Sequence, residues 1–123
     1  MRKNEEKQSK NITLNIRALE GFAGIFEILG SKTRLKILEM ISREEKCVNF
    51  LSKELKLSQP TISYHLKLLF DLDLVKQYKS AQWVRYRLNR ERLVRLMVDF
   101  PKTYGILMGK EEKKRKNEES IVC

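Results

Sequence analysis

Residues 57–69 read LSQPTISYHLKLL and contain clear signals for the start and the buried face of a helix. Ser58 is a favourable N-cap, and Pro60 would lie in the first turn, where a missing backbone N–H does no harm. We therefore expect a helix over 59–71. At about 100° per residue, one arc of this helix is mainly apolar and comprises Ile62, His65, Leu66, Leu69 and Phe70. The opposite arc is polar and comprises Pro60, Thr61, Ser63, Tyr64 and Lys67, with Gln59 at the N-terminal tip.

Two shorter amphipathic segments precede this helix. Ser31 is a second favourable N-cap, and a helix is expected over 33–41. A polar loop over 42–46 follows, and then a helix over 48–56. The residues expected to point inward from these two helices are Leu35, Leu38, Ile41, Val48, Leu51 and Leu55. A short turn joins the second of them to the helix at 59–71, as in a helix-turn-helix.

After Leu74 the apolar period changes from 3.6 to two, which is typical of β-strands. We expect a hairpin of two short strands, 75–78 and 83–88, joined around Ser80-Ala81-Gln82. An alanine with a positive φ in that turn would cost about 1 kcal/mol. The aromatic residues Trp83 and Tyr86 are expected to pack the hairpin against the body of the protein.

The first and last amphipathic segments are expected to be helices over 11–30 and 89–108. Gly21 and Gly24 lie inside the first, so either a partner helix approaches closely there or the helix breaks. Asn89 is the expected N-cap of the last helix, and Pro101 predicts a kink or break near Asp99. Both segments carry apolar stripes with the three- and four-residue spacing of helices that pack along other helices. The stripes comprise Ile12, Ile16, Leu19, Ala23, Phe26, Leu93, Met97, Phe100, Tyr104 and Leu107.

The composition indicates one compact domain. The chain has 123 residues and a mass of 14.6 kDa, and its ends, 1–10 and 110–123, read as flexible charged tails around a domain at 11–109. No apolar run could span a membrane, and no secretory signal is evident. Two cysteines, Cys47 and Cys123, cannot form a disulfide framework. We therefore expect a cytoplasmic protein, and exclude a membrane protein and a large multi-domain enzyme.

The positive charge and the order of the predicted helices and strands together indicate a DNA-binding protein. The net charge is +10, and the stretch from Leu74 to Leu88 contains four Lys or Arg residues and no acid. A helix pair followed by a basic hairpin predicts a winged helix-turn-helix, mainly α with a small β-hairpin (α+β), and this fold reads double-stranded DNA with its second helix. The candidate DNA contacts are Gln59, Pro60, Thr61, Ser63, Tyr64, Lys67, Lys76, Lys79, Gln82, Arg85 and Arg87. The alternatives are an ordinary amphipathic helix and a protein-interaction module whose basic face binds an acidic partner.

Three stretches resemble the ArsR/SmtB family of dimeric winged-helix repressors. LGSKTRLKILEMI at 29–41 is similar to the start of the family's second helix, LSQPTISYHLKLL at 57–69 to its recognition helix, and LVKQYKSAQWVRYRL at 74–88 to its wing. The resemblance implies a homodimer formed by the first and last helices, an operator with inverted half-sites, and a repressor. The implied dimer interface comprises Ile12, Ile16, Leu19, Ala23, Phe26, Leu93, Met97 and Phe100.

The sequence departs from the family's metal sites. The resemblance implies Cys-Val-Cys at the start of the third helix, but this chain has Cys47-Val48-Asn49, with Ser52 where some members have a third cysteine. Residues 89–109 contain no histidine, which the family's other site requires. We therefore expect no metal and no cofactor. We also expect no enzymatic activity, because the sequence shows no acid–base pair near a nucleophile and no phosphate-binding Gly-rich loop. An alternative is a regulator that responds to metalloids or redox state through Cys47, with or without Cys123. His65, the only histidine, is expected to have a hydrogen-bonded packing role.

Overall fold

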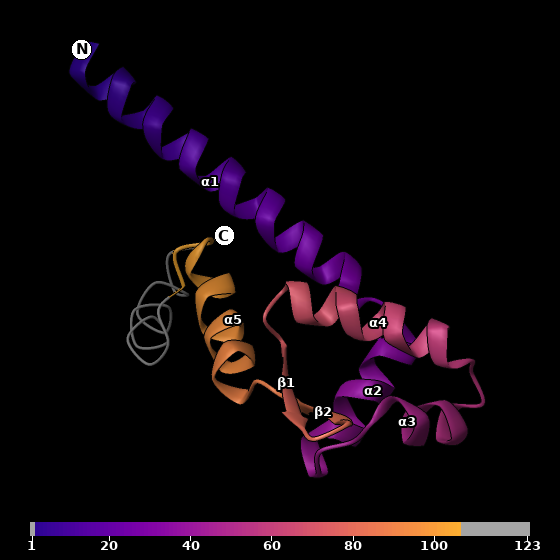
Figure 1. Ribbon diagram of the computed structural model, residues 1–123. Helices are drawn as coiled ribbons and strands as arrows, with labels where there is room; N and C mark the ends of the chain where they lie inside the picture. Colours follow the sequence, from indigo (N-terminus) through magenta and orange to yellow (C-terminus); the bar gives the residue numbers. More distant parts are fainter. Residues whose placement is uncertain (1, 107–123) are drawn as a thin grey trace, which may run out of the picture. The chain divides into compact units, whose positions relative to one another are not determined.

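The structure is a computed structural model that describes the backbone of residues 2–106 and the side chains of residues 16–106. Five helices and one hairpin follow one another in these residues (Figure 1). Their bounds are α1 Arg2–Leu29, α2 Lys32–Arg43, α3 Val48–Leu55, α4 Gln59–Asp71, β1 Val75–Ser80, β2 Trp83–Leu88 and α5 Arg90–Lys102. The chain divides into two compact units, Ala23–Leu93 and the pair Met1–Phe22 with Val94–Cys123, which are described separately below.

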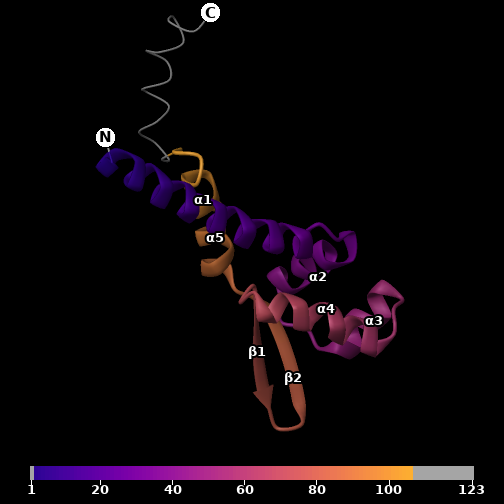
Figure 2. The same cartoon turned by 90° about the horizontal axis from the view of Figure 1, so that it is seen from above.

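The core of the 23–93 unit is formed by α2, α3, α4 and the start of β1. Figures 1 and 2 both show α3 beside α4, and Figure 2 shows the hairpin of β1 and β2 projecting away from these helices. The apolar arc of α4 is buried where it was expected, since Ile62, Leu66 and Leu69 are at most 1% exposed. The other buried apolar residues of this unit are Ile37, Leu38, Ile41, Leu51, Leu74 and Val75.

Local capping signals set the helix boundaries. The Ser31 hydroxyl accepts a hydrogen bond from the Arg34 N–H, and the Ser58 hydroxyl accepts one from the Thr61 N–H, each at 3.3 Å. Lys56 ends α3 in the left-handed conformation, with φ of 56°. The bounds of α4 are those expected from the sequence, and α2 is two residues longer at its C-terminal end than expected.

Two residues that we expected to be buried are exposed. Leu35 is 52% exposed, because the buried face of α2 is centred on Ile37, Leu38 and Ile41 and Leu35 points well away from that centre. Phe70 is 46% exposed, because it lies one 100° step beyond Leu69, at the rim of the buried arc of α4.

The hairpin forms as expected, but its packing differs. A two-residue loop, Ala81-Gln82, joins the strands, and Ala81 has the costly positive φ of 53°. Tyr86 is half-buried, whereas Trp83, next to the loop, is 56% exposed and only borders the α3 region, so our expectation that Trp83 packs the hairpin against the body was wrong. The 42–46 segment is also more ordered than a loop, because the N–H and C=O of Lys46 exchange hydrogen bonds with those of Tyr86 and extend the hairpin.

In the other unit, one aromatic contact joins α1 to α5, and a second joins α5 to the turn that follows it. The rings of Phe22 and Phe100 lie edge to face with centroids 5.2 Å apart, and Phe100 contacts Tyr104 in the same way at 5.4 Å. Leu96 is 2% exposed. An ion pair between Arg95 and Asp99, at 3.2 Å, supports the outer face of α5.

Both terminal helices differ from the expected ranges. α1 begins at Arg2 and runs through both glycines without a break, since the polar residues before Asn11 are mostly good helix formers. α5 ends at Lys102, directly after Pro101, so the break lies three residues beyond Asp99 and the helix is six residues shorter than the expected range to 108. The side chain of Ile12 lies outside the described residues, as do residues 107–109, Leu107 among them, and the predicted C-terminal tail at 110–123.

Candidate nucleic-acid interface

The outer face of α4 is a polar surface open to solvent. Five of the six candidate residues on this face are exposed, and Thr61 is half-buried. The Thr61 hydroxyl lies 2.7 Å from the Ser58 hydroxyl, so part of its bonding capacity is used within the helix cap. The Gln59 amide donates to the Asn49 side chain on α3 at 3.3 Å, which orients Gln59 at the tip of α4. Tyr64, 57% exposed, extends from the middle of this face. The helix therefore presents an amide, hydroxyls, a phenol and one cation, the groups that read base edges and phosphates.

A hydrogen-bonded clip on the inner side holds α4 in place. The Arg34 Nε donates to His65 Nδ1 at 3.1 Å, and the Arg34 Nη1 donates to the Ile28 carbonyl at the same distance. Arg34 thus ties the end of α1 and the start of α2 to the recognition helix. The half-buried His65 has the packing role expected for it, whereas the role of Arg34 was missed. Partial burial, and then the positive charge of Arg34, lower the pKa of His65 below its ordinary value of 6.5.

The lowered pKa of His65, which accepts the hydrogen bond from Arg34, predicts that the protein loses stability in acid. Because the folded chain binds a proton at His65 less readily than the unfolded chain, His65 lowers the stability as the pH falls through 6.5 and has no such effect above it. Urea unfolding at pH 7.5 and 5.5 should show a larger loss on acidification in the unmodified chain than in the His65→Gln variant. Equal losses in the two proteins would contradict the prediction.

The hairpin divides its candidate residues between two faces. In the observed register, Gln77 lies opposite Tyr86 and Tyr78 opposite Arg85, so alternate pairs point to opposite sides. The face that adjoins α4 carries Lys79 with Gln77 and Tyr86. Lys76, Arg85 and Arg87 share the other face, where the Arg87 guanidinium lies over the Tyr78 ring at 4.5 Å. The four hairpin cations therefore do not lie on one face of the hairpin. Their division between the two faces follows from their sequence spacing once the strand register is known.

A hollow of about 330 Å³ separates α4 from the hairpin. It is lined by Ser63, Leu66, Lys67, Phe70, Asp71, Gln77 and Tyr86. The Gln77 amide donates to the Tyr86 hydroxyl at 3.2 Å across the two strands. The lining thus combines hydroxyl, amide and ammonium groups with the Asp71 carboxylate and two apolar side chains, so Lys67 is its one cation. Gln82, in the loop at the end of the hairpin, is exposed.

The residues at the start of α3 do not fit the metal site that the resemblance implies. Cys47 supplies one thiol, and the amide oxygen of Asn49 accepts the hydrogen bond from Gln59. The Ser52 hydroxyl donates to the Leu57 carbonyl. Within the described part of the chain, no group of three or more His, Cys, Asp or Glu side chains could hold a metal ion. One thiolate with an amide and a hydroxyl is a poor ligand set for soft ions.

The comparisons with known proteins identify the family. Residues 31–77 match the family described as bacterial regulatory protein, arsR family. An uncharacterised HTH-type transcriptional regulator of Methanocaldococcus jannaschii is 39% identical over 75 residues, which cover 60% of this chain and 84% of that protein. The chain belongs to the ArsR family. The arsenical resistance operon repressor of Staphylococcus xylosus is 39% identical to this ArsR-family chain over 69 residues, 56% of this chain and 66% of that one.

A solved structure supports the same assignment. The ArsR-like transcriptional regulator from Rhodococcus sp. RHA1 is 25% identical, with a TM-score of 0.64 over 81% of this chain and 90% of that one. The winged helix-turn-helix fold and the family resemblance are thereby confirmed, and the ArsR family is one of regulators rather than enzymes. The chain spans about half to two thirds of the length of the first curated relatives. No helix in the described residues is long and apolar enough to cross a membrane.

Proposed function

We propose that this ArsR-family chain is a sequence-specific regulator that binds double-stranded DNA in the cytoplasm and represses transcription as a homodimer. One observation carries the proposal. The inner side of α4 is buried, with Ile62, Leu66 and Leu69 at most 1% exposed, while its outer side is polar and open to solvent. A helix held in this way can enter the major groove without exposing apolar surface.

The proposed roles follow from chemistry and position. Gln59, at the tip of α4, can pair with adenine through its amide, and Thr61, Ser63 and Tyr64 can reach base edges or phosphates. Lys67, on the same helix, would contact the phosphate backbone, as would Lys79 on the adjoining face of the hairpin. Gln82 at the hairpin loop would lie nearest the minor groove. The cations on the opposite hairpin face, Lys76, Arg85 and Arg87, would add to the positive field and contact phosphates where the DNA passes the hairpin.

The proposed dimer uses the apolar stripes of α1 and α5. In this single chain, Ile16 is 50%, Leu19 41% and Met97 46% exposed, and a second copy packed against these stripes would bury them. Ala23 is also exposed, and Phe26, Leu93 and Phe100 are half-buried. A two-fold dimer would present two recognition helices to half-sites about 34–36 Å apart, so an inverted-repeat operator is expected.

Selection of bound duplexes from a random DNA pool tests this proposal directly. A sequence-specific dimer should enrich an inverted repeat whose half-sites are one helical turn apart. A module that binds an acidic protein through its basic face would enrich no consensus. Enrichment of a single half-site would contradict the proposed dimer but not the proposed sequence-specific binding.

Two substitutions on the same helix face should have different effects on DNA binding. Gln59→Ala should change the preferred base at one position, by about 1–3 kcal/mol. Lys67→Ala should weaken binding to all sequences alike and flatten the slope of log affinity against log salt concentration by about one unit. Titrations of selected and scrambled duplexes at several salt concentrations measure both. If Lys67→Ala changed the base preference and Gln59→Ala did not, the two roles would be reversed.

We also propose that DNA binding is independent of the family's usual metal ions. Cys47 is a single thiol, and the neighbouring Asn49 side chain is bonded to Gln59. Cadmium or arsenite ions should therefore change the affinity for the selected operator by less than about twofold, because a lone thiolate binds soft ions weakly. Gel shifts across a concentration series of each ion measure this. Release of DNA that disappears in the Cys47→Ser variant would instead favour the metalloid-responsive alternative.

A further inference from the structure

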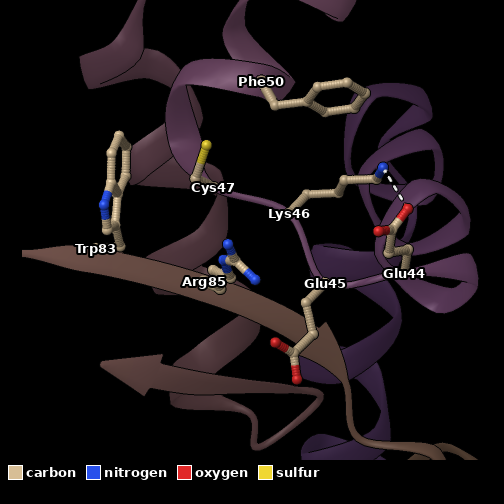
Figure 3. A pocket seen from close by; sticks show the side chains of 7 residues that line it. All are labelled: Glu44, Glu45, Lys46, Cys47, Phe50, Trp83 and Arg85. Carbon is tan, nitrogen blue, oxygen red and sulfur yellow. Dashed lines mark hydrogen bonds and ion pairs between the residues drawn. The ribbon is translucent and has the colours of Figure 1, made fainter. Parts of the chain in front are cut away.

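A second hollow, of about 300 Å³, opens between the start of α3 and strand β2 (Figure 3). Cys47 and Phe50 line it on the α3 side, and Trp83 and Arg85 line it on the β2 side. Residues 44–46 complete its rim. Its volume is at the lower end of the range for small-molecule sites. None of the roles proposed above requires a concave site here.

The hollow offers aromatic surface to a ligand. Trp83 is 56% exposed and Phe50 is 37% exposed, although both are large apolar rings. Figure 3 shows Trp83 and the sulfur of Cys47 pointing to the same side of β2. An open indole beside a thiol and a phenyl ring forms a wall against which a planar ring can stack.

The charges around the hollow leave one cation without a partner. The Glu44 carboxylate lies 3.2 Å from the Lys46 ammonium, which also lies over the Phe50 ring at 4.3 Å. The Glu45 carboxylate lies 4.0 Å from the Arg87 guanidinium. Arg85, in contrast, forms no hydrogen bond or ion pair with another described residue. Each of the two glutamates is thus paired with a cation other than Arg85, and the Arg85 guanidinium is available to bind an anion.

We propose that this hollow binds a small planar aromatic carboxylate. The carboxylate would accept two parallel hydrogen bonds from Arg85, and the ring would stack against Trp83. A neutral aromatic amide would lose the charged contact, and a small aliphatic acid would lose the stacking surface. Occupancy would also place a negative charge on a cation assigned to the DNA backbone and so weaken DNA binding. That consequence rests on the proposed function, whereas the binding site itself does not.

The single tryptophan gives a direct readout that needs no DNA. The ¹⁵N-labelled full chain shows one indole N–H signal, and it is titrated with sodium benzoate, with benzamide as the neutral twin and with sodium acetate as the anion without a ring. Benzoate should move the indole signal along a saturating curve, while benzamide and acetate should leave it nearly unchanged. A benzoate titration without saturation, or an equal saturating shift with benzamide or acetate, overturns the proposal.

Two variants assign the anion contact. Arg85→Gln should weaken benzoate binding by about tenfold or more, because a charge-assisted hydrogen bond is lost. Lys53→Gln removes an exposed cation of α3 that does not line the hollow, and should leave the affinity unchanged. Backbone amide spectra verify that each variant is folded. Equal weakening in both variants would indicate a general charge effect and would overturn the assigned site.

Discussion

Replacing Leu66 with alanine is expected to lower the free energy of unfolding by about 3 kcal/mol. Leu66 lies in the middle of α4 and is 1% exposed. Its neighbours on the same face, Ile62 and Leu69, are fully buried, so the truncation leaves a cavity in the core that the packed surroundings can only partly fill. Urea unfolding of the full chain, followed by circular dichroism, measures the change.

The adjacent residue provides the control for this experiment. Lys67 is exposed on the opposite face of the same helix, and Lys67→Ala should change the stability by less than about 0.5 kcal/mol. Leu66→Ala should also keep the base preference of the unmodified protein at temperatures where it remains folded, because its side chain lies on the buried face and not on the face proposed to contact DNA. A Leu66→Ala protein as stable as the unmodified chain would show that α4 is not anchored through this residue.

The elements with local signals could be predicted from the sequence. Ser58 and Pro60 define the start of α4 within a few residues, and capping needs no information from distant parts of the chain. The change of period after Leu74 likewise predicts where the hairpin lies. The polar arc of α4 follows from the helical period alone, and five of its six candidate residues are exposed.

The features that depend on distant partners could not be predicted. Periodicity shows which way a helix face points but not how wide an arc the neighbouring elements cover, so Leu35 and Phe70 were wrongly placed in the core. The pairing of Lys46 with Tyr86 and the clip from Arg34 to His65 join residues far apart in the sequence. No local signal marks either contact.

The hairpin is an intermediate case. The sequence shows that the hairpin carries four cations, but the face on which each cation lies depends on the strand register. The length of the loop sets that register, and a two-residue loop at Ala81-Gln82 could not be predicted, because it needs a positive φ that alanine disfavours. The exposed position of Trp83 follows from the same loop, because the residue directly after it lies at the far end of the hairpin.

Asn89 is expected to be the most sensitive polar residue of the fold. It is 6% exposed, and its side chain amide donates to the Asp73 carbonyl at 2.8 Å while its amide oxygen accepts from the Arg92 N–H at 3.3 Å. It therefore caps α5 and at the same time fastens the end of β2 to the turn before β1. Asn89→Ala loses both bonds and should lower the free energy of unfolding by about 2 kcal/mol.

Asn89→Asp separates these two contributions. The carboxylate can still accept from the Arg92 N–H, so the helix cap is retained, but it cannot donate to the Asp73 carbonyl and places a negative charge beside that oxygen. We expect this variant to lose about 1 kcal/mol or more, and urea unfolding at neutral pH measures both proteins. If Asn89→Asp were as stable as the unmodified chain while Asn89→Ala was not, the cap alone would account for the residue. If both variants were unchanged, the junction between the hairpin and α5 would not depend on Asn89, and other contacts would have to hold it.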